Sequence, residues 1–354
     1  MGAVLFVVLE MSARVYLFGI AGLVPAMVNS VRGLPQTGYT QPSPEPRLVF
    51  ELKPNVDGLF KLVAFRTNSR GLRDQEYALR KPRNTFRVAV VGSSFALPAG
   101  VAIERAFHSL LEDRLSREFA PLRYEFINFA VGMYHPEQVL AMLELRALDY
   151  DPDLVLFTAT RLSMPWLVHD PASEAGQEIR RLDPDALPGF QKSYPFLRSF
   201  FRRLVMQRMG YEAPSPREEV GSFEKLFIAI DERWSPPVPV RNPGARVAPA
   251  YRAEGSVIQR MAQVRERTGI PIALIRLEFE DAERLPIDFE VEEEARAHGI
   301  PYLDTRDAFR GTRASDFWIY ELDPHPSWKA HEVFAQVIEP FLRSNGLLSE
   351  PTQP

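Results

Sequence analysis

The stretch FRVAVVGSSF, residues 86–95, decides the fold of this chain. Residues 88–91 (VAVV) form an unbroken apolar run closed by a glycine, which is typical of a strand buried on both faces of a parallel sheet. Gly92 lets the chain turn sharply where the strand ends, so we expect Ser94 at the carboxyl edge of the sheet. Parallel α/β sheets bind their ligands at that edge. The stretch therefore predicts a fold class and a candidate functional residue together.

The same pattern continues along the chain, where short apolar runs alternate with amphipathic segments. We expect strands over residues 86–91, 124–129, 154–158, 272–277 and 301–303, and helices over residues 104–118, 136–148, 255–268, 289–298 and 327–344. This alternation predicts a three-layer α/β domain around a flavodoxin-like, doubly wound parallel sheet. The gap over residues 165–251 is too long for one crossover and should form an inserted cap region.

Composition narrows the possible functions. The chain has 354 residues, 45% of them hydrophobic, which allows one large domain over 48–345 and a short tail over 346–354. A net charge of -4 gives no reason to expect a nucleic-acid partner. The absence of cysteine excludes disulfides, a thiol nucleophile and cysteine-based metal sites. No metal or nucleotide-binding motif occurs, so we expect no metal and no cofactor.

The N-terminal residues indicate a membrane anchor. Residues 3–28 are apolar apart from Glu10, Ser12 and Arg14, and a helix over them would be about 39 Å long, enough to cross a bilayer. Glu10 and Arg14 are four positions apart, so they can form a helical ion pair that offsets part of their insertion cost. The alternative is a buried or interfacial helix. We expect an anchor over 1–32 and then an extended linker over 33–47, which contains four prolines.

A second segment, LDPHPSWKAH at residues 322–331, supplies the partners that a serine nucleophile needs. Such a nucleophile requires a base within hydrogen-bond reach and a carboxylate that orients the base. Asp323 and His325 lie two positions apart on a loop held by prolines and can supply both. His331 is expected to pack or to anchor the loop. The alternatives are a proline-rich turn for this segment and a helix N-cap for Ser94.

Several blocks of the sequence together resemble the SGNH/GDSL hydrolase family, in particular its membrane-anchored bacterial members. Residues 66–74 (RTNSRGLRD) look like the segment before the nucleophile strand, and residues 86–101 are similar to the nucleophile block. Residues 128–134 (NFAVGMY) resemble the second block, residues 151–155 (DPDLV) introduce the third, and residues 323–331 match the last. Their order and spacing make the combination more specific than any one block.

The resemblance implies a role for each matching residue. Ser94 would be the nucleophile, His325 the general base and Asp323 the residue that orients the base. The backbone N–H groups of Ser94 and of Gly132 or Met133 would hold the oxyanion. The family's Gly-Asp-Ser is Gly-Ser-Ser here, which keeps the nucleophile and loses the acid between the two.

The third block departs most from the family pattern. Its Gly-x-Asn-Asp is replaced by TATRLS at residues 158–163, so the asparagine that helps to bind the oxyanion is missing. Loss of one such donor costs an enzyme about 3 to 4 kcal/mol of transition-state stabilisation. We expect Arg161 to replace the asparagine, with Thr160 and Ser163 as further candidates.

These observations predict a membrane-anchored esterase or O-acyltransferase on the extracytoplasmic, periplasmic side. The resemblance implies acyl groups of an exported carbohydrate as substrate, with small lipids and thioesters as alternatives. The alternative is a catalytically impaired relative that serves in polysaccharide binding or assembly. Residues 196–208, a basic amphipathic stretch, could bind an anionic surface or form an ordinary cap helix. His135 could contact substrate or be an ordinary loop residue.

Overall fold

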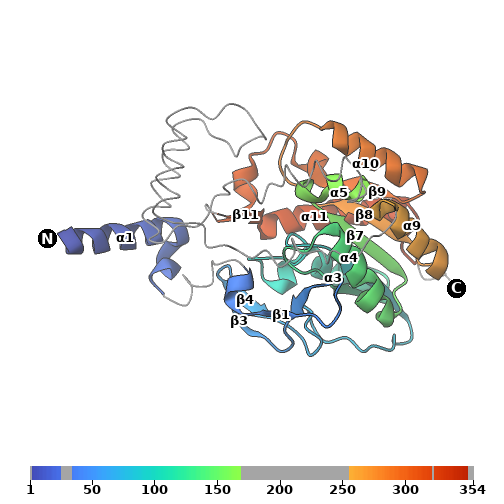
Figure 1. The fold of residues 1–354 in the computed structure, drawn as a ribbon, viewed down its shortest axis with the longest axis horizontal. Helices are drawn as coiled ribbons and strands as arrows, with labels where there is room; N and C mark the ends of the chain where they lie inside the picture. Colours follow the sequence, from blue (N-terminus) through green and yellow to red (C-terminus); the bar gives the residue numbers. More distant parts are fainter. Residues whose placement is uncertain (1, 25–33, 169–254, 321–322, 350–354) are drawn as a thin grey trace.

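A five-stranded parallel sheet lies at the centre of the computed structural model, which describes residues 2–24, 34–168, 255–320 and 323–349 (Figure 1). Its strands are β5 (Thr85–Val91), β6 (Arg123–Asn128), β7 (Leu154–Ala159), β8 (Ile272–Arg276) and β9 (Tyr302–Asp304). Their order in the sheet is β6-β5-β7-β8-β9. This is the flavodoxin-like, doubly wound order, and its switch point lies between β5 and β7. The sequence predicts each of these strands to within one residue at each end.

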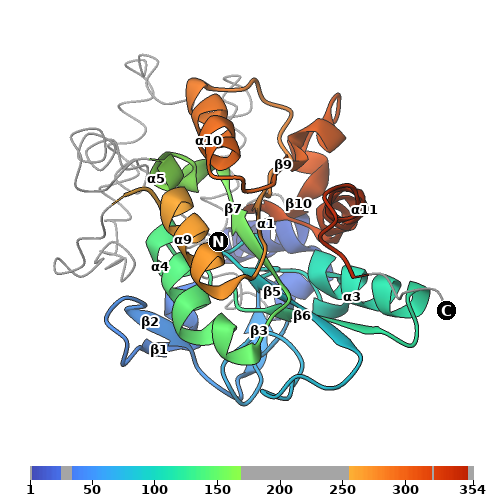
Figure 2. The same ribbon diagram turned by 90° about the vertical axis from the view of Figure 1, so that its right-hand side faces the viewer.

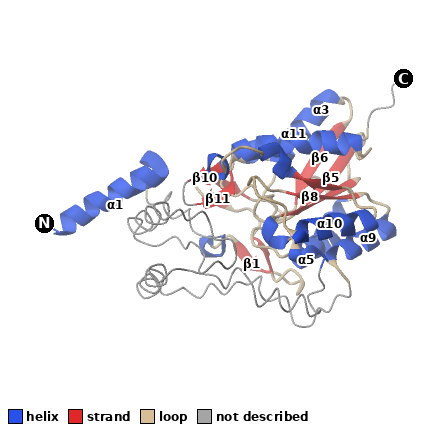
Figure 3. Cartoon of the chain, turned by 90° about the horizontal axis from the view of Figure 1, so that it is seen from above, coloured by secondary structure: helices blue, strands red, loops and turns tan. Residues whose placement is uncertain are grey.

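Helices cover both faces of the sheet and complete the three layers (Figures 2 and 3). One face carries α3 (Phe107–Glu118) and α11 (Trp328–Ser344), and the other carries α4 (Pro136–Met142), α9 (Val257–Thr268) and α10 (Pro286–Ala297). All five helices expected from the sequence are present. The chain continues beyond α4 as a π-helix over Leu143–Ala147 and a 3-10 turn over Leu148–Tyr150.

The expected cap region is described only at its start, where α5 (Pro165–Val168) follows β7. The basic amphipathic stretch at residues 196–208 lies outside the described residues.

Three antiparallel hairpins that the sequence analysis does not predict lie outside the central sheet. They are β1 (Thr40–Pro42) with β2 (Phe50–Leu52), β3 (Asp57–Phe60) with β4 (Val63–Arg66), and β10 (Trp318–Tyr320) with β11 (Asp323–Pro326). The Asp323 to Pro326 segment, expected as a loop, is therefore a short strand.

The proline-rich segment over residues 33–47 differs from the expected linker. A 3-10 turn covers Leu34–Thr37, β1 pairs with β2, and Leu34 is only 4% exposed. The folded part of the chain thus begins before Leu48, because pairing with β2 captures a segment whose composition alone favours an extended chain.

The N-terminal helix is shorter than expected. α1 (Gly2–Phe18) is followed by a 3-10 turn over Gly19–Leu23, and the glycines in that turn are poor helix formers. Across the described part of the chain, no helix is both long enough and apolar enough to cross a membrane. The expected ion pair is present, with Arg14 Nε 2.8 Å from Glu10 Oε1. Figure 3 shows α1 extending away from the domain.

Candidate active site

Ser94 lies in the turn that follows β5, at the switch point of the sheet. We call residues 92–101 the nucleophile turn. Gly92 passes so close to β7 that a Cβ atom there would lie 1.8 Å from Thr158 Oγ1, so a glycine is required. Leu97 N–H donates to Ser93 O at 2.9 Å and closes the turn. Ser94 is half-buried in this arrangement, as expected at a ligand-binding edge.

Asp323 and His325 form the expected pair on β11. His325 Nδ1 lies 2.5 Å from Asp323 Oδ1, and the backbone N–H of His325 donates to the same oxygen at 3.3 Å. Asp323 is 2% exposed. A buried carboxylate that bonds the imidazole in this way fixes its orientation and favours the tautomer with the proton on Nδ1. Nε2 then keeps its lone pair and can act as a base.

Two residues that the sequence analysis missed complete the surroundings of Asp323. Lys61 Nζ donates to Asp323 Oδ2 and lies 3.2 Å from His325 Nδ1, and Tyr320 Oη donates to Asp323 Oδ2 at 3.3 Å. Burial, followed by the charge of Asp323, raises the pKa of Tyr320, so its hydroxyl stays a neutral donor. No local motif marks Lys61, because its partners are more than 200 positions away in the sequence.

The nucleophile turn and the Asp323–His325 pair lie against each other. The ring of Phe95, the residue after Ser94, packs edge-on against the imidazole of His325, with 5.7 Å between the ring centroids. At Gly100, an added Cβ atom would lie 2.7 Å from Ile319 Cδ1. The β10–β11 hairpin therefore packs on the nucleophile turn at two places.

The expected oxyanion loop lies beside Ser94. A Cβ atom added to Gly132 would lie 3.9 Å from the Cβ atom of Ser94, and Val131 N–H donates to Gly92 O at 3.1 Å. Met133 has a φ of 72°, in the left-handed region that favours glycine. The backbone thus takes a glycine-like turn at Met133. The choice between the N–H groups of Gly132 and Met133 stays a prediction.

Arg161 starts a 3-10 turn directly after β7, at the expected edge of the sheet. Its Nη1 lies 3.6 Å from Glu280 Oε2, and both side chains are more than one third exposed. Ser163 Oγ accepts from Thr160 N–H and donates to Thr160 O, both at 2.8 Å, so the Ser163 side chain shapes the turn by binding the backbone of Thr160. The role of Arg161 at the oxyanion stays a prediction, and its pairing with Glu280 weakens it.

Arg73 fixes the nucleophile turn by binding its backbone. Its guanidinium donates to the carbonyl oxygens of Leu97 at 2.7 Å, Pro98 at 2.5 Å and Val101 at 2.8 Å. Arg73 belongs to residues 66–74, the first block of the family resemblance. Through Arg73, this block positions the turn that carries Ser94.

Asn128 ties the nucleophile turn to the oxyanion loop. It is 1% exposed, donates to Ala96 O at 2.8 Å and accepts from Ala130 N–H at 2.9 Å. Its own backbone N–H donates to Asp74 Oδ2 at 2.8 Å. Burial raises the pKa of Asp74 to about 8. The two loops are thus fixed to each other by buried polar contacts.

Two further histidines have structural contacts. His331 is fully buried, its Nδ1 accepts from Phe107 N–H at 3.2 Å, and burial lowers its pKa to about 3. This confirms the expected packing role. His135 caps α4 by accepting from Glu137 N–H at 3.4 Å, and its ring lies 4.8 Å from that of Trp166. A substrate contact by His135 stays a prediction.

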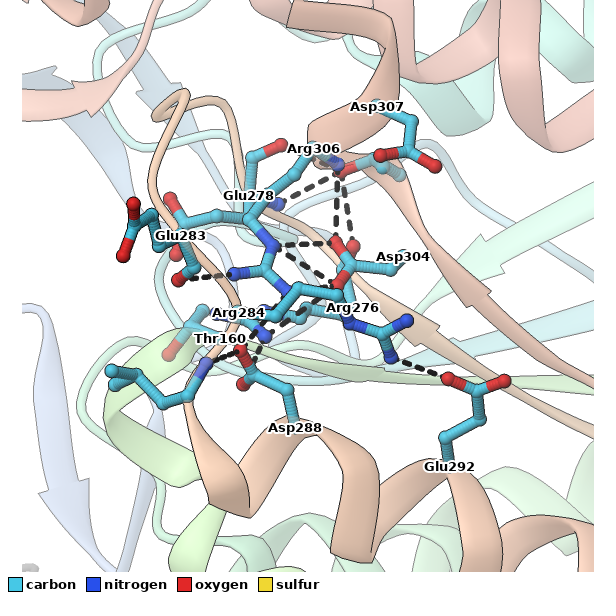
Figure 4. Close-up of polar contacts among 12 residues, drawn as sticks. Thr160, Arg276, Glu278, Glu283, Arg284, Asp288, Glu292, Asp304, Arg306 and Asp307 are labelled. Carbon is cyan, nitrogen blue, oxygen red and sulfur yellow. Dashed lines mark hydrogen bonds and ion pairs between the residues drawn. The ribbon is translucent and has the colours of Figure 1, made fainter. Parts of the chain in front are cut away.

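An ionic cluster braces the ends of β8 and β9 (Figure 4). Arg276, 1% exposed, binds Asp288 of α10, and Arg306 Nη2 lies 3.1 Å from Asp288 Oδ2 and 2.5 Å from Asp304 Oδ2. The charges of the two carboxylates balance those of the two arginines, so we interpret the cluster as stabilising the fold. The loop after β8 carries Phe279. The centroid of its ring lies 5.7 Å from that of Phe95 in the nucleophile turn.

No model of a known protein family matches this chain, and no curated protein is similar to it in sequence. Among solved structures, it is similar to LAE5, an α/β hydrolase from the metagenome of Lake Arreo, with 16% identity, a TM-score of 0.39, and coverage of 75% of this chain and 97% of that one. It is also similar to a catalytic mutant of the acetylxylan esterase Axe2 from Geobacillus stearothermophilus, with 13% identity, a TM-score of 0.40, and coverage of 76% and 97%.

A third similar structure is the lipase/acylhydrolase from Enterococcus faecalis, with 12% identity, a TM-score of 0.40, and coverage of 76% of this chain and 100% of that one. By name, the three structures are an α/β hydrolase, an acetylxylan esterase and a lipase/acylhydrolase. Identities and scores this low do not transfer an activity, so the function is argued from the residues of this chain.

Proposed function

We propose that this protein is a serine ester hydrolase or O-acyltransferase with Ser94 as its nucleophile. The observation that supports the proposal is the bonded Asp323–His325 pair, whose imidazole packs on the residue that follows Ser94. A serine from one segment and a carboxylate–imidazole pair from another are the groups that acyl transfer needs.

The proposed reaction has two halves. His325 Nε2 takes the Ser94 hydroxyl proton while Oγ attacks the acyl carbonyl, and the oxyanion meets the backbone N–H groups of Ser94 and of Gly132 or Met133. The bond to the alcohol breaks as the alcohol takes the proton from His325, which leaves an acyl-enzyme. Water, or a second alcohol in a transferase, then attacks the acyl-enzyme with His325 again as base, and Ser94 is regenerated.

Labelling with a fluorophosphonate probe tests this proposal. The wild type should be labelled at Ser94, Ser94→Ala and His325→Ala should lose labelling, and Ser93→Ala, the neighbouring serine, serves as the matched control and should keep it. A wild type that resists the probe would instead favour the alternative, an impaired relative that binds polysaccharide. Retention of the protein on immobilised acylated polysaccharide would then be the measurement to make.

We further propose that the substrate is an acylated exported carbohydrate and that residues 3–28 hold the protein at the membrane on the periplasmic side. The consecutive residues Val4, Leu5, Phe6, Val7 and Val8 are 47–68% exposed, and consecutive helical residues point to all sides. Such a helix suits an apolar environment.

Cell fractionation tests the membrane proposal. The full-length protein should sediment with membranes, resist a high-salt wash and be released by detergent. Leu5→Asp should weaken this retention, whereas an exposed lysine of the domain changed to aspartate, Lys53→Asp, should not. Full-length protein that stays in the supernatant without detergent would contradict the anchor.

A further inference from the structure

Lys61 is a buried lysine at the tip of the β3–β4 hairpin. It is 7% exposed, and it and Leu62 form the two-residue turn with φ values of 49° and 70°. Turns of this kind require positive φ at both central residues and normally use Asn-Gly. The local sequence therefore does not favour this turn. Contacts elsewhere in the fold must hold Lys61 in place.

Those contacts lie at the proposed active site. Nζ donates to Asp323 Oδ2 and lies 3.2 Å from His325 Nδ1, and the Lys61 Cβ atom lies 3.2 Å from an ideal Cβ at Gly100 of the nucleophile turn. The β3–β4 hairpin thus inserts a cation between the nucleophile turn and the β10–β11 hairpin.

The position of the imidazole proton decides what Lys61 can do. A carboxylate oxygen and a ring nitrogen at 2.5 Å repel each other unless a proton lies between them, so His325 Nδ1–H donates to Asp323. The Lys61 ammonium group therefore faces an N–H group of His325 and cannot donate to a lone pair there. Its effect on the ring is electrostatic, and a positive charge so close disfavours a second proton on the imidazole.

We propose that Lys61 is a positioning residue of the catalytic machinery. It holds the Asp323 carboxylate through a charged hydrogen bond, and its charge keeps the His325 imidazole unprotonated at mildly acidic pH. This inference rests on the proposed function of Ser94, Asp323 and His325. It extends the site by one residue and accounts for the burial and the strained turn of Lys61 together.

Other titratable groups of the described chain lie beside this pair or beside the nucleophile turn. Tyr320 of β10 donates to Asp323 as a neutral hydroxyl. Arg73 binds carbonyl oxygens of the nucleophile turn on the side of Leu97 and Val101. The surrounding groups are present in every Lys61 variant, so a shift that occurs in Lys61→Gln and not in Lys61→Arg follows the lysine charge.

Three variants of the full-length protein separate charge from contact. Lys61→Gln keeps a hydrogen-bond donor without the charge, Lys61→Met removes both, and Lys61→Arg keeps both. Lys81→Met is the matched control, because Lys81 also pairs with carboxylates, Asp153 at 2.7 Å and Asp151 at 3.3 Å, but near the amino-terminal end of β7.

The rate of fluorophosphonate labelling of Ser94 is measured from mildly acidic to alkaline pH. The acid limb should move to higher pH by about one unit or more in Lys61→Gln and Lys61→Met. The plateau rate should fall about tenfold to a hundredfold in Lys61→Met, since the carboxylate loses its support. Lys61→Arg should keep the acid limb near its original position, and Lys81→Met should match the wild type.

Nuclear magnetic resonance of ring-labelled histidine gives a second readout that does not need activity. The signal that disappears in His325→Gln belongs to His325, and its titration midpoint should rise in Lys61→Gln. An unchanged midpoint and acid limb in Lys61→Gln, with a reactive wild type, would overturn the inference alone. A wild type that never labels refutes the proposed function, while the midpoint still decides whether Lys61 controls the imidazole.

Discussion

His331 should make the stability of this protein depend on pH below neutrality. Its imidazole is fully buried on α11 and stacks on Phe107, and its Nδ1 accepts a hydrogen bond from Phe107 N–H. Within the described chain its Nε2 has no hydrogen-bond partner. Protonation of Nδ1 would break the bond to Phe107 and bury a charge. Burial accordingly lowers the pKa of His331 from 6.5 to about 3.

The sign and size of the effect follow from this shift. A histidine whose pKa is lower in the folded state stabilises the fold fully above pH 6.5, and the contribution is lost as the pH falls from 6.5 towards 3. Each unit corresponds to about 1.36 kcal/mol. Between pH 7.5 and pH 5.0, His331 should therefore remove about 2 kcal/mol from the free energy of unfolding.

The variant His331→Asn tests this value. An asparagine Oδ1 can accept from Phe107 N–H in place of Nδ1, and the side chain does not titrate. The smaller side chain leaves space in the core and lowers stability at every pH, so the comparison concerns the change with pH alone. The second buried histidine, His108, is present in both proteins, and its contribution cancels in the difference.

Urea unfolding at pH 7.5 and pH 5.0, followed by circular dichroism, measures the effect. The wild type should lose about 2 kcal/mol more than His331→Asn between the two conditions. Equal losses in the two proteins would show that His331 does not stay neutral in the folded state. The reasoning from burial would then be refuted.

Three further variants test the loops around Ser94. Gly92→Ala should cost about 1 to 3 kcal/mol of stability by urea unfolding, because its Cβ would meet Thr158 Oγ1 at 1.8 Å, and strictly additive losses in the double variant with Thr158→Ala would contradict this contact. Met133→Gly should keep Ser94 labelling. It should raise the free energy of unfolding by about 1 kcal/mol, because it relieves the strain of a φ of 72°. A clear loss of stability would argue against strain there. Arg161→Ala should lower kcat less than tenfold because the guanidinium already pairs with Glu280, whereas a parallel fall of kcat and kcat/KM by about a hundredfold would restore its oxyanion role.

The sequence predicts the central sheet well because each strand is marked locally. The runs that became β5, β7 and β8 are mostly apolar, as expected of strands covered on both faces, and glycine or proline lies beside most of them. Three hairpins outside the sheet were missed because their strands have only three or four residues. Their pairing depends on partners that sequence periodicity does not reveal.

The N-terminal helix and the linker were predicted from composition rather than from local periodicity. Composition favours a long apolar helix over residues 3–28, but α1 ends at Phe18, ahead of glycines that local hydropathy hardly penalises. The prolines of residues 33–47 favour an extended chain, and the structure pairs part of this segment with β2. In both cases composition indicates a preferred backbone conformation. The length of the element and its packing depend on contacts with the rest of the fold.

By itself the sequence determined the doubly wound fold and brought forward Ser94, Asp323 and His325 as candidates, because glycine, proline and apolar runs leave local marks. Only the tertiary structure decided what surrounds them: Lys61 and Asp323 are separated by 262 positions, yet their side chains form a buried ion pair. A lysine in a short turn has the same local pattern whether it faces solvent or a carboxylate. Its role is therefore set by long-range packing, which places a cation beside the imidazole that it can control.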